Sequence, residues 1–525
     1  MLGLRGYRMG PRSRRPAITL VIALSVVAGA AFYAALGPMS GAAAPAACRH
    51  RPVSGTTVVS GAPGAVAAGV ASALFGCAPT LVIANADRLY DVAVAVAAAE
   101  QAHAPLLLSS PLSPSTVSYR GAPGARPAAY GGTAALREIN DLHPRNVLAV
   151  GLTTSDVSAE MPGARVTTDL GRLARMTPPA PLRRVVVLVP AGNSAAAMAA
   201  AATATSAGAT VVPVQNYDPR DDPAAITALT ATRPRQVIAA GGGFGPVSRL
   251  VSRLAVAMTG VQLPGGGQLV VPMHRLVALY GHPGVPALGA LGQQKLTASV
   301  ARARKVAAGY RALSAMPVVP TFEIITTVAT AAPGTDGTYS AKTPVADLSR
   351  WVSAATRAGM YVILDLQPGR DNFLRQAQMY QSVLKLPNVG LALDPEWKLQ
   401  PGQLPLHQIG SVSITEVNSV VTWLAQLTAQ YRLPQKLLVL HQFKLGEIAD
   451  EQRLDTHNDD LAIVLNMDGQ GTPVMKEQTW VAVTSTAPPG VAFGWKNFLV
   501  KDQPMLSPAQ TMTANPPGPV LISYQ

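Results

Sequence analysis

The residues of this chain best suited to chemistry stand two apart, directly after short apolar runs in the C-terminal half. The run LALDPE, at residues 391–396, ends in Asp394 and Glu396. Side chains alternate between the two faces of a strand, so residues two apart at a strand end point the same way. Four more runs follow this pattern, ending in Tyr280 and His282, Asp365 and Gln367, His441, and Asn466 and Asp468. The spacing predicts one polar site assembled from five strand ends.

The pair of carboxyl groups at 394 and 396 suits general acid catalysis. Carboxyls on one face can differ in pKa, so that one stays ionised while the other carries a proton to deliver. Trp397 follows them and offers a flat apolar surface of the kind that stacks on a sugar ring. Glycoside hydrolysis requires two carboxyls roughly 5–10 Å apart. The second carboxyl is left open among Asp365, Glu323 and Asp468.

We therefore expect a glycosidase-like site in which Glu396 is the general acid and Asp394 or Asp365 orients or stabilises the reacting groups. The residues expected to bind substrate are Tyr280, His282, Glu323, Gln367, Trp397, His441, Asn466, Asp468 and Trp495. Polar strand ends can also form a satisfied hydrogen-bond network without catalysis. A degenerate site that only binds thus remains the alternative.

Metal-assisted hydrolysis is a competing chemistry for the same strand ends. The side chains of suitable type are His282, Asp365, Asp394, His441 and Asp468. The sequence contains neither a His-x-His at the first of these strands nor an HExxH segment. We predict no metal ion and no other cofactor.

The elements that must position these residues follow from the hydrophobic pattern. Apolar runs that alternate with amphipathic stretches indicate buried parallel strands covered by helices. Eight strands are expected at residues 276–280, 322–328, 361–365, 389–394, 436–440, 461–466, 491–495 and 520–524, with 479–484 competing for the seventh place. Over about 250 residues this alternation predicts a (β/α)8 TIM-like barrel at 274–525, with its site at the carboxyl ends of the strands.

The preceding part, residues 48–265, also alternates between strand and helix patterns. Strands are expected at 80–84, 104–108, 146–150, 184–189, 210–214 and 236–240, and Ala-rich helices at 91–100 and 194–207. The segment contains a duplication at a constant offset of 90 residues, in which Leu136, Ile139, Pro144, Val147 and Gly151 correspond to Ile226, Leu229, Pro234, Val237 and Gly241. The prediction is a duplicated, Rossmann-like α/β domain with parallel sheets.

The N-terminal arm, residues 1–47, has the features of an export segment. Five arginines precede an uncharged apolar run at 17–36, which is long enough to cross a bilayer as one helix. Ala44-Pro45-Ala46 has the small-x-small form of a cleavage site, so a membrane anchor and a cleaved signal peptide are both open. The only cysteines, Cys48 and Cys77, are expected to form a disulfide outside the cell.

Two stretches of the chain resemble known families. The segments NADRLYDVAVAVAAAE, APLLLSSP, HPRNVLAVG and RPRQVIAAGG resemble the cell wall-binding repeat family, which implies non-covalent attachment to anionic wall polymers. The segments YGHPGVPALGALG, VILDLQPGR, VGLALDPEWKL, KLLVLHQF and GWKNF resemble an uncharacterised family of exported actinobacterial barrel domains, which brings no assigned reaction.

Together these observations predict an exported protein at the outer face of the plasma membrane or in the cell wall. The expected partners are a cell-wall polysaccharide or an anionic envelope polymer, and the membrane itself if the N-terminal helix is not cleaved. The net charge of +14 would favour such polymers. Outside the arm the cations are scattered and export separates them from cytoplasmic nucleic acid, so no nucleic-acid partner is expected. The alternative is a non-catalytic wall-binding protein.

Overall fold

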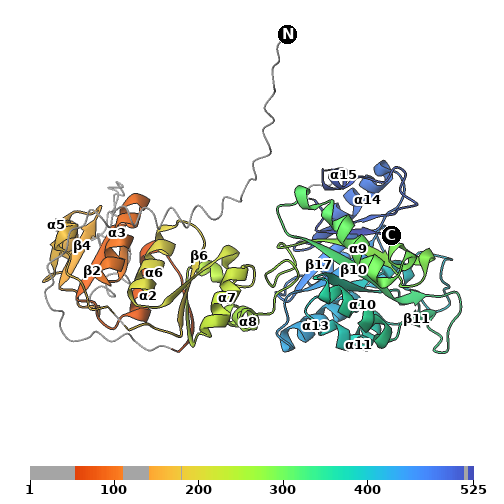
Figure 1. Ribbon diagram of the computed structural model, residues 1–525, viewed down its shortest axis with the longest axis horizontal. Helices are drawn as coiled ribbons and strands as arrows, with labels where there is room; N and C mark the ends of the chain where they lie inside the picture. The colour runs from red at the N-terminus through yellow and green to blue at the C-terminus, as the bar shows by residue number, and fades with distance from the viewer. Residues whose placement is uncertain (1–53, 110–140, 179, 514–517) are drawn as a thin grey trace, which may run out of the picture. The chain divides into compact units, whose positions relative to one another are not determined.

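The computed structural model describes residues 54–525 except 110–140, 179 and 514–517 (Figure 1). Two compact units make up this part of the chain. The first contains the described residues up to Val212 together with Pro234–Gly242, and the second contains Pro213–Arg233 and Gly243–Gln525. The proposed catalytic residues all lie in the second unit.

The N-terminal half contains two four-stranded sheets with the same strand order. One runs β3 (Leu106–Ser109), β2 (Thr80–Asn85), β4 (Asn146–Val150), β5 (Arg165–Thr167), and the other β7 (Thr210–Val214), β6 (Val185–Pro190), β8 (Gln236–Ala240), β1 (Gly55–Val59). Strand β1, from the start of the described chain, pairs parallel with β8 just as β5 pairs parallel with β4. The predicted duplicated α/β architecture is therefore confirmed, although the sequence did not predict strands β1 and β5.

Alanine-rich helices hold these sheets together. Helices α2 (Pro63–Leu74) and α3 (Leu89–Ala102) both pack against α6 (Ala195–Ser206). Eight of the twelve residues of α6 are buried, and most of these are alanine, whose small side chain lets helices approach closely. Cys77 is disulfide-bonded, and its expected partner Cys48 lies outside the described residues. Leu136 and Ile139 of the proposed repeat also lie outside them.

The C-terminal part is a closed barrel of eight parallel strands. In order around the ring these are β9 (Arg275–Gly281), β10 (Val318–Ala329), β12 (Tyr361–Leu366), β13 (Val389–Leu393), β15 (Lys436–Gln442), β17 (Leu461–Met467), β18 (Ala492–Asn497) and β19 (Leu521–Tyr524). Strand β9 pairs in parallel with both β10 and β19, which closes the ring. The predicted TIM-like barrel and all eight of its strands are confirmed.

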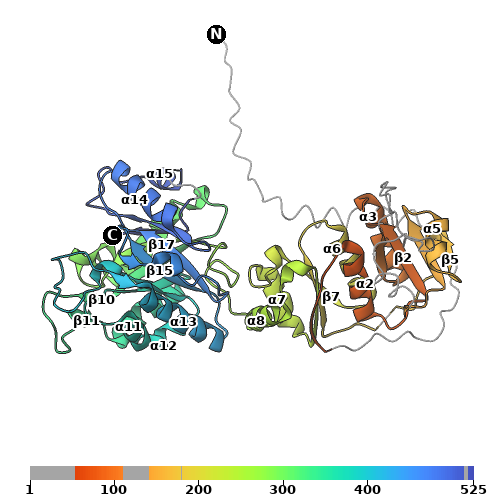
Figure 2. The same ribbon diagram turned by 180° about the vertical axis from the view of Figure 1, so that it is seen from behind.

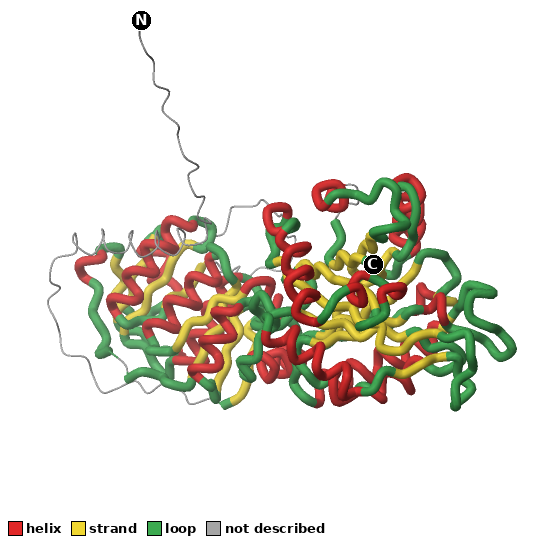
Figure 3. Tube along the Cα trace, turned by 45° about the vertical axis from the view of Figure 1, so that its right-hand side comes forward, coloured by secondary structure: helices red, strands yellow, loops and turns green. Residues whose placement is uncertain are grey.

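Helices surround the barrel and cover its apolar strands (Figures 2 and 3). They are α9 (Leu296–Ala308), α10 (Val345–Arg357), α11 (Phe373–Met379), α12 (Gln381–Leu384), α13 (Ile414–Gln430), α14 (Pro473–Thr486) and α15 (Pro508–Thr513). One apolar layer lies between strands and helices, and a second fills the barrel with side chains such as Ala278, Ile363 and Val439. A filled interior leaves the carboxyl ends of the strands as the place for a site.

Three sequence expectations are corrected or lie beyond the described chain. Residues 479–484, which competed for the seventh strand, belong to helix α14. The sequence also predicts one amphipathic helical stretch at 371–386, but the structure has two helices there, which are separated at Tyr380. None of the helices that the structure describes is long and apolar enough to cross a bilayer, and the apolar run at 17–36 lies outside the described residues.

Candidate active site

A buried cluster of ionisable side chains lies at the carboxyl ends of the barrel strands. The strands deliver one or two members each: Tyr280 from β9, Glu323 from β10, Asp365 from β12, Asp394 after β13, His441 from β15, Asn466 and Asp468 from and after β17, and Lys496 from β18. All are buried. Because these strands are parallel, ends that are far apart in the sequence meet at one edge of the barrel.

His441 is the centre of this cluster. Its Nε2 lies 3.1 Å from Glu323 Oε1, and its Nδ1 lies 3.2 Å from Asp468 Oδ2. Burial lowers the pKa of His441, but the hydrogen bonds to Asp468 and Glu323 outweigh burial, and the net pKa lies well above its usual value. The raised pKa favours the protonated ring, which donates a hydrogen bond to a carboxylate on each side.

Lys496 is a site residue that sequence reasoning missed. Its Nζ lies 3.1 Å from Asp468 Oδ2 and 3.6 Å from the centre of the Tyr280 ring, a cation–π contact. Burial lowers the pKa of Lys496, but Asp468 and Asp394 raise it, and the net shift is upward. Burial likewise raises the pKa of Asp468, yet Lys496 and His441 reverse this, and the net shift is downward. Asp468 is thus held ionised.

Strand alternation explains why Lys496 was missed and Trp495 was chosen. The two are neighbours on β18, so they face opposite sides of the strand. Trp495 packs outward against Trp480 of α14, with ring centres 5.9 Å apart, and is completely buried there. The structure does not bring Trp495 to the cluster. Reading GWKNF with Lys496 rather than Trp495 on the inner face would have found it.

Two carboxyls below the opening, Asp365 and Asp394, have pKa values that burial raises. Tyr280 donates a hydrogen bond to Asp365 Oδ2 at 2.7 Å. Burial, with Glu323 nearby, raises the pKa of Asp365 to about 6. Burial together with Glu396 and Asp365 raises the pKa of Asp394 well above its usual range. One oxygen each of Glu323, Asp365 and Asp394 has no hydrogen-bond partner in the part of the chain that the structure describes.

An open cavity of about 890 Å³ lies above this cluster. Of the ionisable residues in the cluster, Tyr280, Asp468 and Lys496 line it, together with Gln367, Glu396 and Trp397. Asp394 and Glu396 do not sit at one depth, because β13 ends at Leu393 and Pro395 starts a 3-10 turn. Glu396 therefore stands at the cavity wall, while Asp394 lies beneath it. Burial, followed by the charge of Asp468, raises the pKa of Glu396 to about 7.

His282 lies apart from the cluster. The spacing predicted that Tyr280 and His282 face the same way, but Gly281 between them has a φ of 141°, which breaks the alternation of an extended strand. The His282 Nδ1 lies 2.8 Å from the carbonyl oxygen of Ile325. The prediction that Tyr280 and His282 face the same site is therefore wrong, since only Tyr280 lines the cavity.

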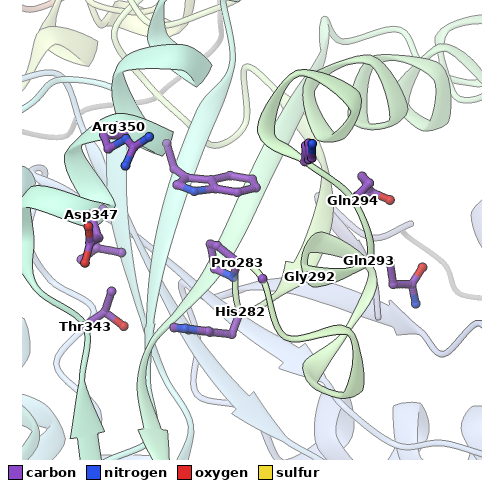
Figure 4. Close-up of a pocket in the computed structure, with 12 residues that line it drawn as sticks. His282, Pro283, Gly292, Gln293, Gln294, Thr343, Asp347 and Arg350 are labelled. Carbon is purple, nitrogen blue, oxygen red and sulfur yellow. The ribbon is translucent and has the colours of Figure 1, made fainter.

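The His282 side chain lines a separate polar pocket of about 570 Å³. Figure 4 shows it with Pro283 between Asp347 and Arg350 on one side and Gln293 and Gln294 on the other. This pocket lies between the segment after β9 and helix α10, and it shares no lining residue with the large cavity. It is therefore a second hollow, separate from the acidic cluster.

Within the described residues, no group of three or more His, Cys, Asp or Glu side chains is arranged to hold a metal ion. The acids of the cluster are instead separated by the two cations His441 and Lys496. What the arrangement offers is a proton donor, Glu396, and an ionised carboxylate, Asp468, on the wall of one cavity. That combination suits proton transfer to a leaving group beside a stabilising negative charge.

Comparison with known proteins adds little to this geometry. No family model and no curated protein sequence matches the chain. Among solved structures, the chain is similar to Cwp6 from Clostridium difficile, with 10% sequence identity and a TM-score of 0.30. The similarity covers 68% of this chain and 66% of that one. Both family resemblances found in the sequence motifs therefore remain expectations.

Proposed function

We propose that the barrel is a glycoside hydrolase that acts on a saccharide of the cell envelope. The observation that carries the proposal is the pair of carboxyls on one cavity wall with pKa values driven apart. The pKa of Glu396 is raised to about 7, whereas that of Asp468 is lowered. Divergent pKa values within one site mark the acid and the ionised partner of a two-carboxyl reaction.

In this mechanism Glu396 protonates the leaving glycosidic oxygen as the glycosidic bond breaks. A water molecule then adds to the sugar carbon and returns a proton to Glu396. Asp468 faces the same cavity and supplies the negative charge that stabilises the positive sugar ring in the transition state. His441 and Lys496 keep Asp468 ionised through the contacts at 3.2 and 3.1 Å. Trp397 lines the same wall and offers a stacking surface for a sugar ring. Asp365 and Asp394, buried below, orient these groups rather than touch substrate.

The cellular setting rests on the sequence. An arginine-rich arm and an apolar run at 17–36 support export, and the repeat motifs of the N-terminal half support binding to an anionic wall polymer. The barrel would then act at the outer face of the membrane or in the wall. Wall polysaccharide, or the membrane through an uncleaved N-terminal helix, is the proposed partner.

The test is release of reducing ends from purified envelope polysaccharides by the complete chain. Wild type should release them, and Glu396→Gln should lower the rate roughly 100- to 10,000-fold, the usual contribution of a general acid. Glu477→Gln, which changes an exposed acid on α14, is the matched control and should keep the wild-type rate. Binding of polysaccharide without release by wild type would instead identify a non-catalytic binding protein.

A further inference from the structure

We propose that the ligand of the barrel is an amphiphilic glycoside, with a neutral sugar in the acidic cavity and a hydrocarbon chain in an apolar hollow beside it. The inference rests on the proposed function, whose site it deepens by naming the substrate class. Two adjoining spaces carry it. Glu396, Trp397 and Leu406 line both of them, so one ligand can occupy both at once.

The smaller space is a hollow of about 300 Å³ formed by the segment that follows β13. Its apolar lining consists of Trp397, Leu399, Pro405, Leu406 and Ile409, and its polar lining of Glu396, His407 and Gln408. Glu396, the proposed acid, lies on the wall that this hollow shares with the large cavity. A hydrocarbon attached to the leaving side of the glycosidic bond would therefore leave Glu396 next to the bond that breaks.

Apolar side chains also ring the opening of the large cavity although they face solvent. Leu406, Leu445 and Met475 line it from the segments after β13, β15 and β17, and they are 84%, 47% and 54% exposed. Leu406 has a φ of 65°, a left-handed conformation that is uncommon for a bulky residue. Exposed apolar side chains gathered at the rim of a polar cavity mark a binding surface for apolar groups.

The charge around the cavity selects the kind of head group. The charged side chains that line the large cavity are two carboxyls, Glu396 and Asp468, and two lysines, Lys444 and Lys496. A lining in which two acids are balanced by two lysines has no net charge to attract a phosphate or carboxylate head group. An uncharged sugar fits the polar floor, and a hydrocarbon chain joined to it fits the apolar hollow. The occupant that fits both spaces is a neutral sugar that carries a single hydrocarbon chain.

The test is a chain-length series measured by isothermal titration calorimetry on the complete protein. The probes are methyl, butyl, hexyl and octyl glucosides at concentrations below micelle formation. If the chain enters the hollow, each added methylene should tighten Kd about fourfold until the hollow is full. Leu406→Ser and Ile409→Ser should each flatten this dependence. Leu313→Ser, which changes an exposed leucine before β10 at the opposite end of the strand, is the matched control and should keep it.

Other outcomes decide against the inference or against hydrolysis alone. Equal affinity for the methyl and octyl glucosides would overturn it, as would a dependence that Leu406→Ser and Ile409→Ser leave intact. Binding to neutral phospholipid vesicles that is lost in the same two variants would identify a bilayer as the occupant, and also overturn it. Reducing-end release without chain-length dependence refutes this inference alone, whereas chain-length dependence without release refutes only hydrolysis.

Discussion

The carboxyl of Glu447 should limit the stability of the barrel at alkaline pH. Glu447 is 2% exposed and lies in the segment after β15. Its Oε2 accepts hydrogen bonds from the backbone N–H groups of Phe443 at 3.0 Å and Lys444 at 3.4 Å. Its Oε1 has no partner within the described chain. Burial raises its pKa, the two N–H groups lower it, Glu396 and Asp468 raise it, and the result is about 8.

This pKa sets the size and the sign of the effect. The unfolded chain releases the proton near the ordinary value of 4.5, and the folded chain releases it near 8. Between these two values the folded state binds more protons, so the free energy of unfolding falls by about 1.4 kcal/mol for each pH unit. The stabilisation present below pH 4.5 is lost by pH 8, a change of at most about 5 kcal/mol.

The perturbation is Glu447→Gln, which keeps an oxygen acceptor for both N–H groups and cannot ionise. All five tryptophans lie between residues 351 and 495, so tryptophan fluorescence during urea unfolding reports on the barrel. Between pH 5 and pH 9 the variant should gain roughly 3–5 kcal/mol relative to wild type, with little difference at the acidic end. Glu477→Gln, an exposed acid, should follow wild type. Parallel curves for wild type and Glu447→Gln would refute the buried, protonated carboxyl.

Three further measurements test the charges of the barrel. Lys436 is buried with its Nζ 2.8 Å from the carbonyl oxygens of Leu386 and Val389, and burial lowers its pKa to about 7. Between pH 7 and 10 the Lys436 side chain binds more protons in the unfolded chain than in the folded one. It should therefore add about 1.4 kcal/mol per pH unit to the wild-type free energy of unfolding in urea, a contribution that Lys436→Met should lack. Lys496→Met leaves Asp468 without its lysine cation and should lower the free energy of unfolding by about 3–5 kcal/mol at pH 7. The loss should be smaller at pH 4, where Asp468 of the variant takes up a proton. Equal losses at both pH values would contradict the ion pair. Reducing-end release should fall tenfold per pH unit above about 7 as Glu396 ionises, whereas a rate that still rises at pH 9 would exclude Glu396 as the acid.

The barrel was predictable because most of its strands carry a clear hydrophobic signal. Most are buried on both sides and begin as an apolar run, as in Val389–Leu393 and the first five residues of Leu461–Met467. Strand β1 lacks that signal because it is half exposed, and β5 is only three residues long. Their places in the sheets depend on pairing with β8 and β4, which are distant in the sequence. Such long-range pairing leaves no trace in local periodicity.

The site was predictable only where the strands stay regular to their ends. Period-two spacing correctly brings Asp365, His441 and Asp468 together, but it fails where the backbone leaves the extended conformation. Gly281, with φ of 141°, turns His282 away, and the turn at Pro395 separates Asp394 from Glu396 in depth. Which neighbour on a strand faces inward also depends on packing against helices. Trp495 packs against Trp480 of α14 on the outer side of the barrel, and its neighbour Lys496 therefore points inward.

The placement of protons in this barrel argues for chemistry rather than for structural support. A structural network of buried carboxyls is stable when every oxygen has a partner. Here one oxygen each of Glu323, Asp365 and Asp394 has none within the described residues, and the pKa values of Asp365, Glu396 and Glu447 rise to about 6, 7 and 8. These three carboxyls release their protons in steps around neutral pH, and they lie beside an ionised Asp468 and an open cavity. Their raised pKa values lower the free energy of unfolding at neutral pH. The same features supply what a glycosidic oxygen needs, a proton donor near neutral pH next to a fixed negative charge. Departures of this kind from a fully satisfied interior are expected at functional sites.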